Sequence, residues 1–143
     1  MICMGTENYQ FSKYWTMEKF VGKTVFDSKG QNCGKIKSVL IDPKSFSISG
    51  IIIKMRFSKE YFLSQDYFDE INETGLRLNS IPIKPGDKVT DVDGKNIGKV
   101  VQIRLNSDTN KIESLEIKSG LKSKMISSDR IVAIGEKIKI QSF

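Results

Sequence analysis

Short stretches of alternating apolar and polar residues make up most of the sequence from residue 20 onward. One stretch runs from Gly34 to Ile41 and another from Ile48 to Met55, and turn-forming residues such as Asp42 and Pro43 separate them. Alternation with period two is typical of half-buried β-strands, whereas an amphipathic helix repeats its apolar positions every 3.6 residues. The sequence contains no sustained helical stripe. The pattern therefore predicts an all-β fold.

The predicted strands belong to two copies of one sequence, 64 residues apart. Seven residues of the first copy meet identical residues in the second: Gly22, Val25, Asp27, Gly30, Asn32, Gly34 and Lys35 against Gly86, Val89, Asp91, Gly94, Asn96, Gly98 and Lys99. Three more identities follow, because Ile48, Ile53 and Lys54 meet Ile112, Ile117 and Lys118. We therefore expect two small domains in place of one. The predicted organisation is an N-terminal tail (1–19), a first repeat (20–79) and a second repeat (80–143).

The ends of the two copies also correspond. Residues 61–71 align with residues 125–135, and each segment reads as a short strand, a polar corner and a return strand. Five or six short strands in a repeat of about 60 residues cannot cover both faces of a flat sheet. Each repeat is therefore expected to curl into a small barrel, which would also remove its exposed edges.

Charge and cysteine content indicate a soluble protein of the cytoplasm. The net charge is +6, but the basic residues of the second half are interleaved with acids and spread along the sequence, whereas a nucleic-acid surface clusters them. Two cysteines, Cys3 and Cys33, are too few for a disulfide framework. No stretch is as long and apolar as a membrane span or a signal peptide. Residues 1–16 remain open as a tail, an interaction arm or upstream sequence, because Met17 is an alternative start.

No catalytic, cofactor or metal site is predicted. The sequence contains no histidine, which removes the commonest general base and the usual zinc ligand. The Gly94–Lys99 segment has three residues between its glycines, where a phosphate loop needs four, and it joins strand to strand. A calcium loop beginning at Asp91 would need its bidentate glutamate at the position of Gln102. Cys33 reads as a small buried hydrophobe because Ile97 replaces it in the other copy. We therefore expect a protein that is not an enzyme.

The copies differ most in aromatic content, since residues 69–142 contain no aromatic residue. Phe26, Phe46 and Phe62 occupy strand positions and are expected in the core of the first barrel. The aromatic residues clustered where the copies diverge could belong to the core or to a protein interface, where aromatics are enriched. They are Phe57, Tyr61, Tyr67 and Phe68. Ile52 joins them as a candidate partner-binding residue, because it is expected to point outward and Glu116 replaces it in the second copy.

The shared pattern Gly-x-x-Val-x-Asp-x-x-Gly-x-x-x-Gly-Lys, followed by an apolar strand and an Asp/Asn-rich turn, resembles the PRC-barrel family. The ending Ile-Ser-Ser-Asp-Arg-Ile-Val-Ala-Ile-Gly-Glu of the second copy carries the same resemblance. The resemblance covers residues 20–141 and implies two tandem PRC-type β-barrels. Chains of little more than two such barrels are similar to archaeal cell-division proteins. This similarity implies a non-enzymatic scaffold that forms homodimers or heterodimers with another PRC-barrel protein and links the membrane anchor SepF to the FtsZ machinery.

Two other functions remain open from the same resemblance. The ribosome-maturation factor RimM carries a PRC barrel behind another domain, which implies an RNA- or ribosome-associated binding module as the alternative. The reaction-centre subunit that names the family implies a role beside a membrane cofactor, but this requires a membrane helix that the sequence lacks. On the leading interpretation the chain is cytoplasmic, is recruited to the division site, reaches the membrane only through a partner, and binds no specific nucleic acid.

Overall fold

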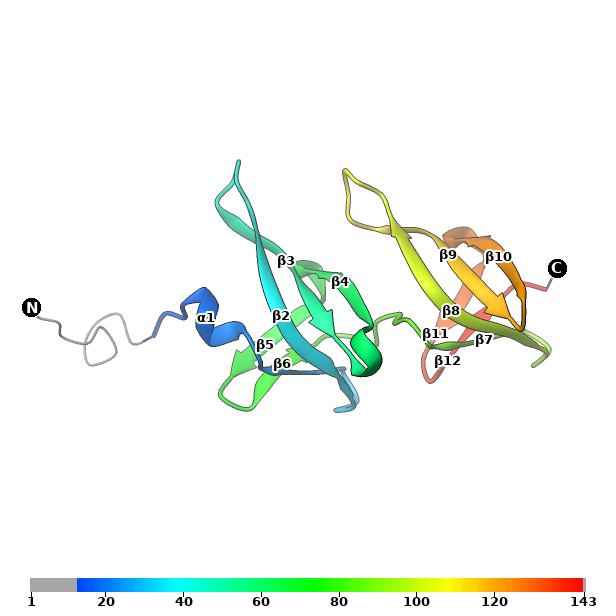
Figure 1. Ribbon diagram of the computed structural model, residues 1–143, viewed down its shortest axis with the longest axis horizontal. Coiled ribbons are helices and arrows are strands. Elements are labelled where there is room, and N and C mark those ends of the chain that lie inside the picture. Colours follow the sequence, from blue (N-terminus) through cyan, green and yellow to red (C-terminus); the bar gives the residue numbers. More distant parts are fainter. Residues whose placement is uncertain (1–12, 143) are drawn as a thin grey trace, which may run out of the picture.

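The computed structural model describes residues 13–142, which form two β-barrels arranged one after the other (Figure 1). Each barrel is built from one six-stranded sheet, and no strand is shared between the two sheets. The structure confirms the predicted all-β class and the two tandem barrels.

The first sheet has the strand order β4-β3-β2-β1-β6-β5. Its strands are β1 (Thr24–Phe26), β2 (Asn32–Asp42), β3 (Ser47–Lys54), β4 (Glu60–Ser64), β5 (Phe68–Asn72) and β6 (Gly75–Leu78). All neighbours are antiparallel except β1 and β6, which run parallel. A short 3-10 turn, η2 (Arg56–Ser58), connects β3 to β4, and a second one, η3 (Gln65–Tyr67), connects β4 to β5.

The second sheet repeats this order as β10-β9-β8-β7-β12-β11. Its strands are β7 (Lys88–Asp91), β8 (Asn96–Leu105), β9 (Ile112–Ser119), β10 (Lys122–Ser127), β11 (Ile131–Ile134) and β12 (Lys137–Ile140). The parallel pair is again the one between the first and last strands, β7 and β12, and the 3-10 turn η4 (Ser128–Arg130) follows β10. The internal repeat of the sequence is therefore a repeat of topology.

Register shifts bend the long strands around the core. In β2 they lie between Ile36 and Ser38 and between Leu40 and Ile41. A bulge inserts a residue without a partner and bends its strand, so residues after it change faces. Ile36 and Val39 are thus both buried although they are three positions apart, while Ile41 is exposed. Strand β8 carries its shifts at the equivalent places.

The barrels are not fully closed by hydrogen bonds. In the described part of the chain β4 and β5 each pair with one strand only, and so do β10 and β11. The expectation that curling removes every edge is therefore wrong. A 3-10 turn bridges the two edge strands of each barrel, because Ser64 and Ser127 cap the turns with their side-chain oxygens and redirect the chain.

From β4 and β10 onward, the two copies no longer align at 64 residues, and these two strands align at 63. Ile53 pairs with Tyr61, and its counterpart Ile117 pairs with Lys124. The β9–β10 turn contains two residues between the paired Ser119 and Lys122, whereas the η2 turn is one residue longer. The alignment of residues 61–71 with 125–135 is therefore wrong by one position, and Phe62 corresponds to Met125.

Each barrel has its own hydrophobic core. The first contains Val25, Cys33, Ile36, Val39, Ile51, Ile53, Tyr61, Leu63, Leu76 and Leu78. The second contains Ile83, Val89, Val100, Leu115, Ile117, Ile126, Ile138 and Ile140. Tyr61 is the aromatic residue of the first buried core. Phe20, Tyr67 and Phe68 are partly buried and pack against this core.

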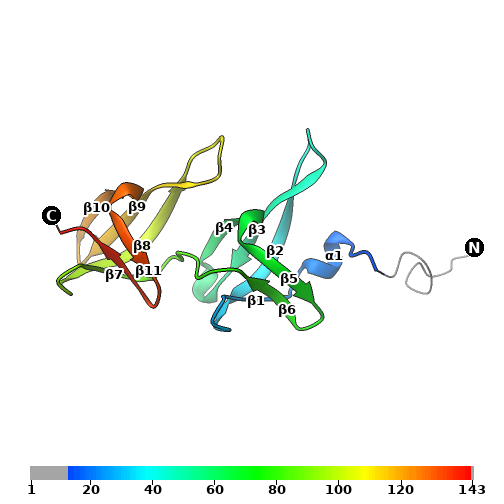
Figure 2. The ribbon, with the colours of Figure 1, turned by 180° about the vertical axis from the view of Figure 1, so that it is seen from behind.

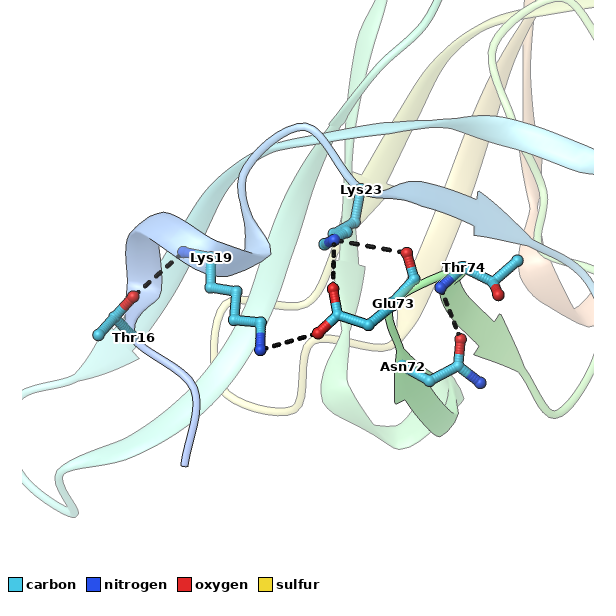
Figure 3. Close-up of polar contacts among 6 residues, drawn as sticks. All are labelled: Thr16, Lys19, Lys23, Asn72, Glu73 and Thr74. Atoms are coloured by element: carbon cyan, nitrogen blue, oxygen red, sulfur yellow. Dashed lines mark hydrogen bonds and ion pairs between the residues drawn. The ribbon is translucent and has the colours of Figure 1, made fainter. Parts of the chain in front are cut away.

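A short helix before the first barrel is tied to the β5–β6 turn. This helix, α1 (Met17–Phe20), is capped by the Thr16 side chain. The Lys19 and Lys23 ammonium groups lie 2.9 Å and 3.3 Å from the Glu73 carboxylate (Figure 3). These two cations lower the pKa of the Glu73 carboxyl. Part of the predicted 1–19 tail thus lies against the barrel, and residues 1–12 lie outside the described residues.

The two barrels stand in similar orientations. The long hairpins β2–β3 and β8–β9 project to the same side of the molecule in both views (Figures 1 and 2). The linker is held to the first barrel, because the Ser28 amide donates to the Ser80 carbonyl and the Asn79 side chain donates to the Asp66 carbonyl. Both barrels therefore present equivalent ends to the same direction.

Candidate functional site

A cleft with a volume of about 440 Å³ lies between the two barrels and has walls from both of them. Its first wall comes from β4, η3 and the linker, and its second wall comes from β8 and the start of β9. The apolar lining residues are Phe62, Leu63, Tyr67, Ile83, Ile103, Leu105 and Ile112. A concave, mostly apolar site with a few polar groups is the kind that binds ligands and peptides.

Phe62 forms the aromatic part of the first wall. It lies on β4 opposite Ile52, and its ring covers Gly50 on the neighbouring strand. A Cβ atom at Gly50 would come within 2.6 Å of the ring and 2.4 Å of the Leu63 carbonyl oxygen. Glycine is therefore needed at this position for β3 and the Phe62 ring to approach each other. The second barrel has Ser114 and Met125 at the equivalent positions, so it builds no such wall.

Polar groups line the rim of the cleft. Asn110, at the tip of the β8–β9 hairpin, has its side-chain nitrogen 3.5 Å from the Ser49 hydroxyl of β3. Asn79 and Asp66 are joined by a hydrogen bond of 2.7 Å, and Lys111 lines the other side. This combination of apolar walls and a polar rim suits an apolar side chain of a bound peptide whose backbone hydrogen-bonds at the rim.

Two of the five predicted partner-binding residues lie at or beside this cleft. Tyr67 lines it, and Ile52 lies next to Phe62 on the outer face of the first sheet, where it is half-buried. Its counterpart Glu116 lies between Gln102 and Met125 on the second sheet. The structure therefore places Ile52 on the outward face that alternation predicted.

The other three predicted residues lie elsewhere. Tyr61 is only 6% exposed, and its hydroxyl donates to the Cys33 carbonyl oxygen at 3.0 Å, so it belongs to the core. Burial raises the pKa of this phenol. Phe57 is 93% exposed at the tip of the η2 turn, and Phe68 lies with Phe20 in a separate hollow at the other mouth of the first barrel. The five residues thus form no single patch.

Phe46 corrects the expectation for the aromatic core. It was predicted inside the first barrel, but it is 85% exposed at the end of the β2–β3 hairpin. Its φ of 57° lies in the left-handed region, and its amide donates to the Asp42 carbonyl to close the turn. Because Phe46 lies in the turn and not on β3, its side chain does not point into the core. Phe26 and Phe62, the other two predicted core aromatics, are half-buried.

Sequence reasoning missed the wall that the second barrel contributes. Ile103, Leu105 and Ile112 are apolar residues of the second repeat, and they lie where the β8–β9 hairpin approaches the first barrel. The alternation marks them as apolar strand residues. Which of them face a neighbouring barrel depends on the bulges in β8 and on the linker, and neither has a signature in the sequence.

The acidic turn residues serve the backbone. The Asp91 carboxylate accepts the amides of Asp93 and Lys95, and Asp27 does the same for Lys29 and Gln31. Within residues 13–142 no three cysteine or acidic side chains converge as metal ligands would. Burial raises the pKa of the Cys33 thiol to about 11, so this thiol is protonated at neutral pH.

Among the described helices, none is long and apolar enough to cross a bilayer.

The family model of the PRC-barrel domain matches the chain twice, over residues 17–78 and 86–142. Comparison with curated proteins finds no significant match. The two matches correspond to the two six-stranded sheets, including α1 in the first. The chain therefore belongs to the PRC-barrel family and carries its domain in tandem.

Proposed function

We propose that this protein is a non-enzymatic adaptor that joins other proteins through the first barrel and the cleft beside it. Its setting in this proposal is cell division, as in the archaeal two-barrel proteins that the sequence resembles. The partners in that setting are a second PRC-barrel protein and a SepF-type membrane anchor connected to the FtsZ machinery. The observation that carries the proposal is the difference between the two barrels at strands β4 and β10.

Strand β4 is an apolar edge, whereas β10 is a charged one. The sequence of β4 places Tyr61, Phe62 and Leu63 at the open edge of the first sheet. The equivalent edge β10 carries Lys122 and Lys124, and lysine on an edge strand prevents pairing with other chains. Strand β4 contains no lysine, and its one charged residue, Glu60, is ion-paired with Lys37. A strand or a hydrophobic side chain of a partner could therefore add at β4, with the backbone supplying hydrogen bonds and the cleft supplying specificity.

Replacing Ile52 by glutamate tests the proposal, since it gives the first barrel the charge that Glu116 gives the second. Ile52 is half-buried on the outer face, so the substitution is expected to leave the barrel folded and to weaken association at least about tenfold. Association is measured by size-exclusion chromatography with light scattering, alone and with a candidate PRC-barrel or SepF-type partner. Met125→Glu, at the counterpart of Phe62, is the matched control and should not change association.

A pull-down with the full chain from the native cell distinguishes the alternatives. Recovery of a PRC-barrel protein or of a SepF-type protein, lost with Ile52→Glu, supports the adaptor. Recovery of ribosomal proteins and ribosomal RNA in their place would support the RimM-like alternative and refute the division role. If the unsubstituted chain is strictly monomeric and recovers no partner protein, the adaptor function itself is refuted.

A further inference from the structure

Both barrels carry a group of cations at the same end, beside the turn that follows β3 or β9. The four in the first barrel are Lys35, Lys54, Arg56 and Lys59. The four in the second barrel are Lys88, Lys99, Lys118 and Lys137. All eight side chains are exposed, and none of them forms an ion pair with another residue of the 13–142 segment. Two positions correspond directly, since Lys35 and Lys54 match Lys99 and Lys118.

In the second barrel the four lysines form a row across four neighbouring strands. Lys137 pairs with Lys88, Lys88 with Lys99, and Lys99 with Lys118. Strands lie about 4.8 Å apart, so the row is about 14 Å long. Like charges directly opposite each other destabilise a sheet. Asp87 and Glu136 precede Lys88 and Lys137 in the sequence, and Asp87 is ion-paired with Lys84, so the row keeps an excess of positive charge.

The sequence conceals this row because its members are far apart along the chain. Lys118 lies 19 positions after Lys99, and Lys137 lies 19 positions after Lys118. Only the register of the four strands brings them together. The lysines that looked dispersed are therefore clustered in space, and a clustered positive surface attracts a polyanion.

A large apolar side chain projects from the tip of each turn at this end. Phe57 is 93% exposed in η2, and Leu121 is fully exposed in the β9–β10 turn. Phe57 adopts a left-handed backbone with φ of 61°, which a bulky residue seldom does. Each tip adjoins a hollow that the cations line. Exposed apolar residues surrounded by lysines are typical of surfaces that enter the interface of a membrane.

The two tips lie on one side of the molecule. The β2–β3 and β8–β9 hairpins project together to the opposite side, so the ends with the η2 and β9–β10 turns face the same way (Figure 1). One flat surface can therefore contact both barrels at the same time. Two linked contacts bind far more tightly than either contact alone when the geometry allows both.

We propose that this end of the tandem barrels docks on an anionic lipid surface, with Phe57 and Leu121 inserted among the lipids and the lysines beside their headgroups. The tips share apolar bulk but not aromaticity, and the second hollow has no aromatic residue on which a base could stack. This favours a membrane over a single-stranded nucleic acid. The docking is independent of the adaptor function and gives the protein its own contact with the membrane, in addition to one through a partner.

Sedimentation of the full chain with lipid vesicles tests the proposal. We expect binding to vesicles of phosphatidylcholine with phosphatidylglycerol, weak binding to pure phosphatidylcholine, and a decrease with added salt. Each lysine beside an anionic membrane strengthens binding about fivefold. Reversing Lys99 and Lys118 together, as Lys99→Glu and Lys118→Glu, should therefore reduce binding at least about tenfold. The pair Phe57→Ser and Leu121→Ser should reduce it by a similar factor.

The opposite end of the molecule supplies matched controls. Phe46→Ser removes a similarly exposed phenylalanine with a left-handed backbone, and Lys44→Glu with Arg104→Glu reverses two exposed cations. These variants should bind vesicles as the parent chain does, and circular dichroism checks that every variant is folded. The proposal would be overturned if the control variants lost vesicle binding to the same extent, or if the protein bound neutral vesicles equally well. Binding of a single-stranded RNA oligonucleotide without vesicle binding would also overturn it. Displacement by inorganic phosphate at millimolar concentration would overturn it as well, in favour of a small-anion site.

Discussion

Cys33 is the residue whose chemistry the fold changes most. It is 2% exposed, and burial raises the pKa of its thiol to about 11 from a usual value of 9.0. Such a shift reduces the thiolate fraction about hundredfold at a given pH, and only the thiolate reacts. In a Cys3→Ser variant, where Cys33 is the single thiol, we expect reaction with a thiol reagent at pH 8 to be at least a hundred times slower in the folded protein than in urea. Labelling rates followed by absorbance measure this.

The same shift makes stability depend on alkaline pH. Because the folded pKa of the Cys33 thiol is higher than the unfolded one, the folded state holds the proton more tightly, and its contribution is complete below pH 9. This contribution is lost as the pH rises from 9 to about 11, at up to about 1.4 kcal/mol per pH unit. Urea unfolding of the Cys3→Ser protein and of the same protein with Cys33→Ala should show a shallower alkaline decline in the second. Identical slopes, or fast labelling of the folded protein, would contradict this account.

At the scale of single elements, the turn between β1 and β2 depends on one carboxylate. Asp27 is buried, and its Oδ1 atom accepts the amides of Lys29 and Gln31 at 2.8 Å and 3.0 Å. Hydrogen bonds to a charged acceptor contribute about 1.5 to 3 kcal/mol each, and their loss leaves amide donors unpaired. We expect Asp27→Ala to lower the free energy of unfolding of the first barrel by about 2 to 3 kcal/mol. Urea titration with tryptophan fluorescence measures it, since Trp15 packs on Phe20, which packs against the core of this barrel.

Two variants distinguish the contribution of these hydrogen bonds from that of burying the Asp27 side chain. Asp27→Asn keeps an oxygen that accepts both amides, so it should cost less than half as much as the alanine. Asp91→Ala removes the equivalent carboxylate of the second barrel and should leave the fluorescence transition unchanged, because this carboxylate accepts the amides of Asp93 and Lys95 within the second barrel. Equal destabilisation by Asn and Ala at position 27 would show that the amide contacts contribute little.

Strands were predictable in this chain because their signals are local. Alternation between Ile48 and Met55 and the Asp-x-x-Gly turn at Asp27 each occupy fewer than ten residues, and the structure places β3 and the β1–β2 turn there. Bulges were not predictable, because they depend on how β2 fits around a core that only the assembled barrel provides. The single extra residue at Phe57 shifted the expected alignment of β4 for a related reason: a turn accepts an insertion that strand pairing does not.

Surfaces were less predictable than strands, because they form between elements far apart in the sequence. Ile52 was correctly placed outward from its alternation alone. The cleft depends on how the β8–β9 hairpin stands against β4, and the lysine row depends on the pairing of β12 with β7 across the length of the repeat. Comparison of the two copies showed that they differ in the segment that contains Phe57. It could not show that Leu121 occupies the equivalent tip, since the two turns differ in length.

At the scale of the whole molecule, two cores joined by a polar contact imply two unfolding units. The core clusters share no residue, and the described hydrogen bonds between the barrels and the linker are few and lie at the surface. Domains with their own cores and a small interface unfold separately unless docking couples them. All tryptophan and tyrosine residues lie in the first 67 positions. Fluorescence therefore reports the first barrel, whereas circular dichroism reports both.

Equivalent core substitutions in the two barrels test this independence. Ile51 and Leu115 are matched positions on β3 and β9, and both are almost fully buried. Ile51→Ala should lower the urea midpoint seen by fluorescence, with a loss of about 2 to 5 kcal/mol, because the cavity collapses only partly. Leu115→Ala should leave the fluorescence transition in place and shift only part of the circular dichroism transition. If both substitutions moved both signals together, the barrels would be one cooperative unit, and the cleft between them would be part of its core and closed to any partner.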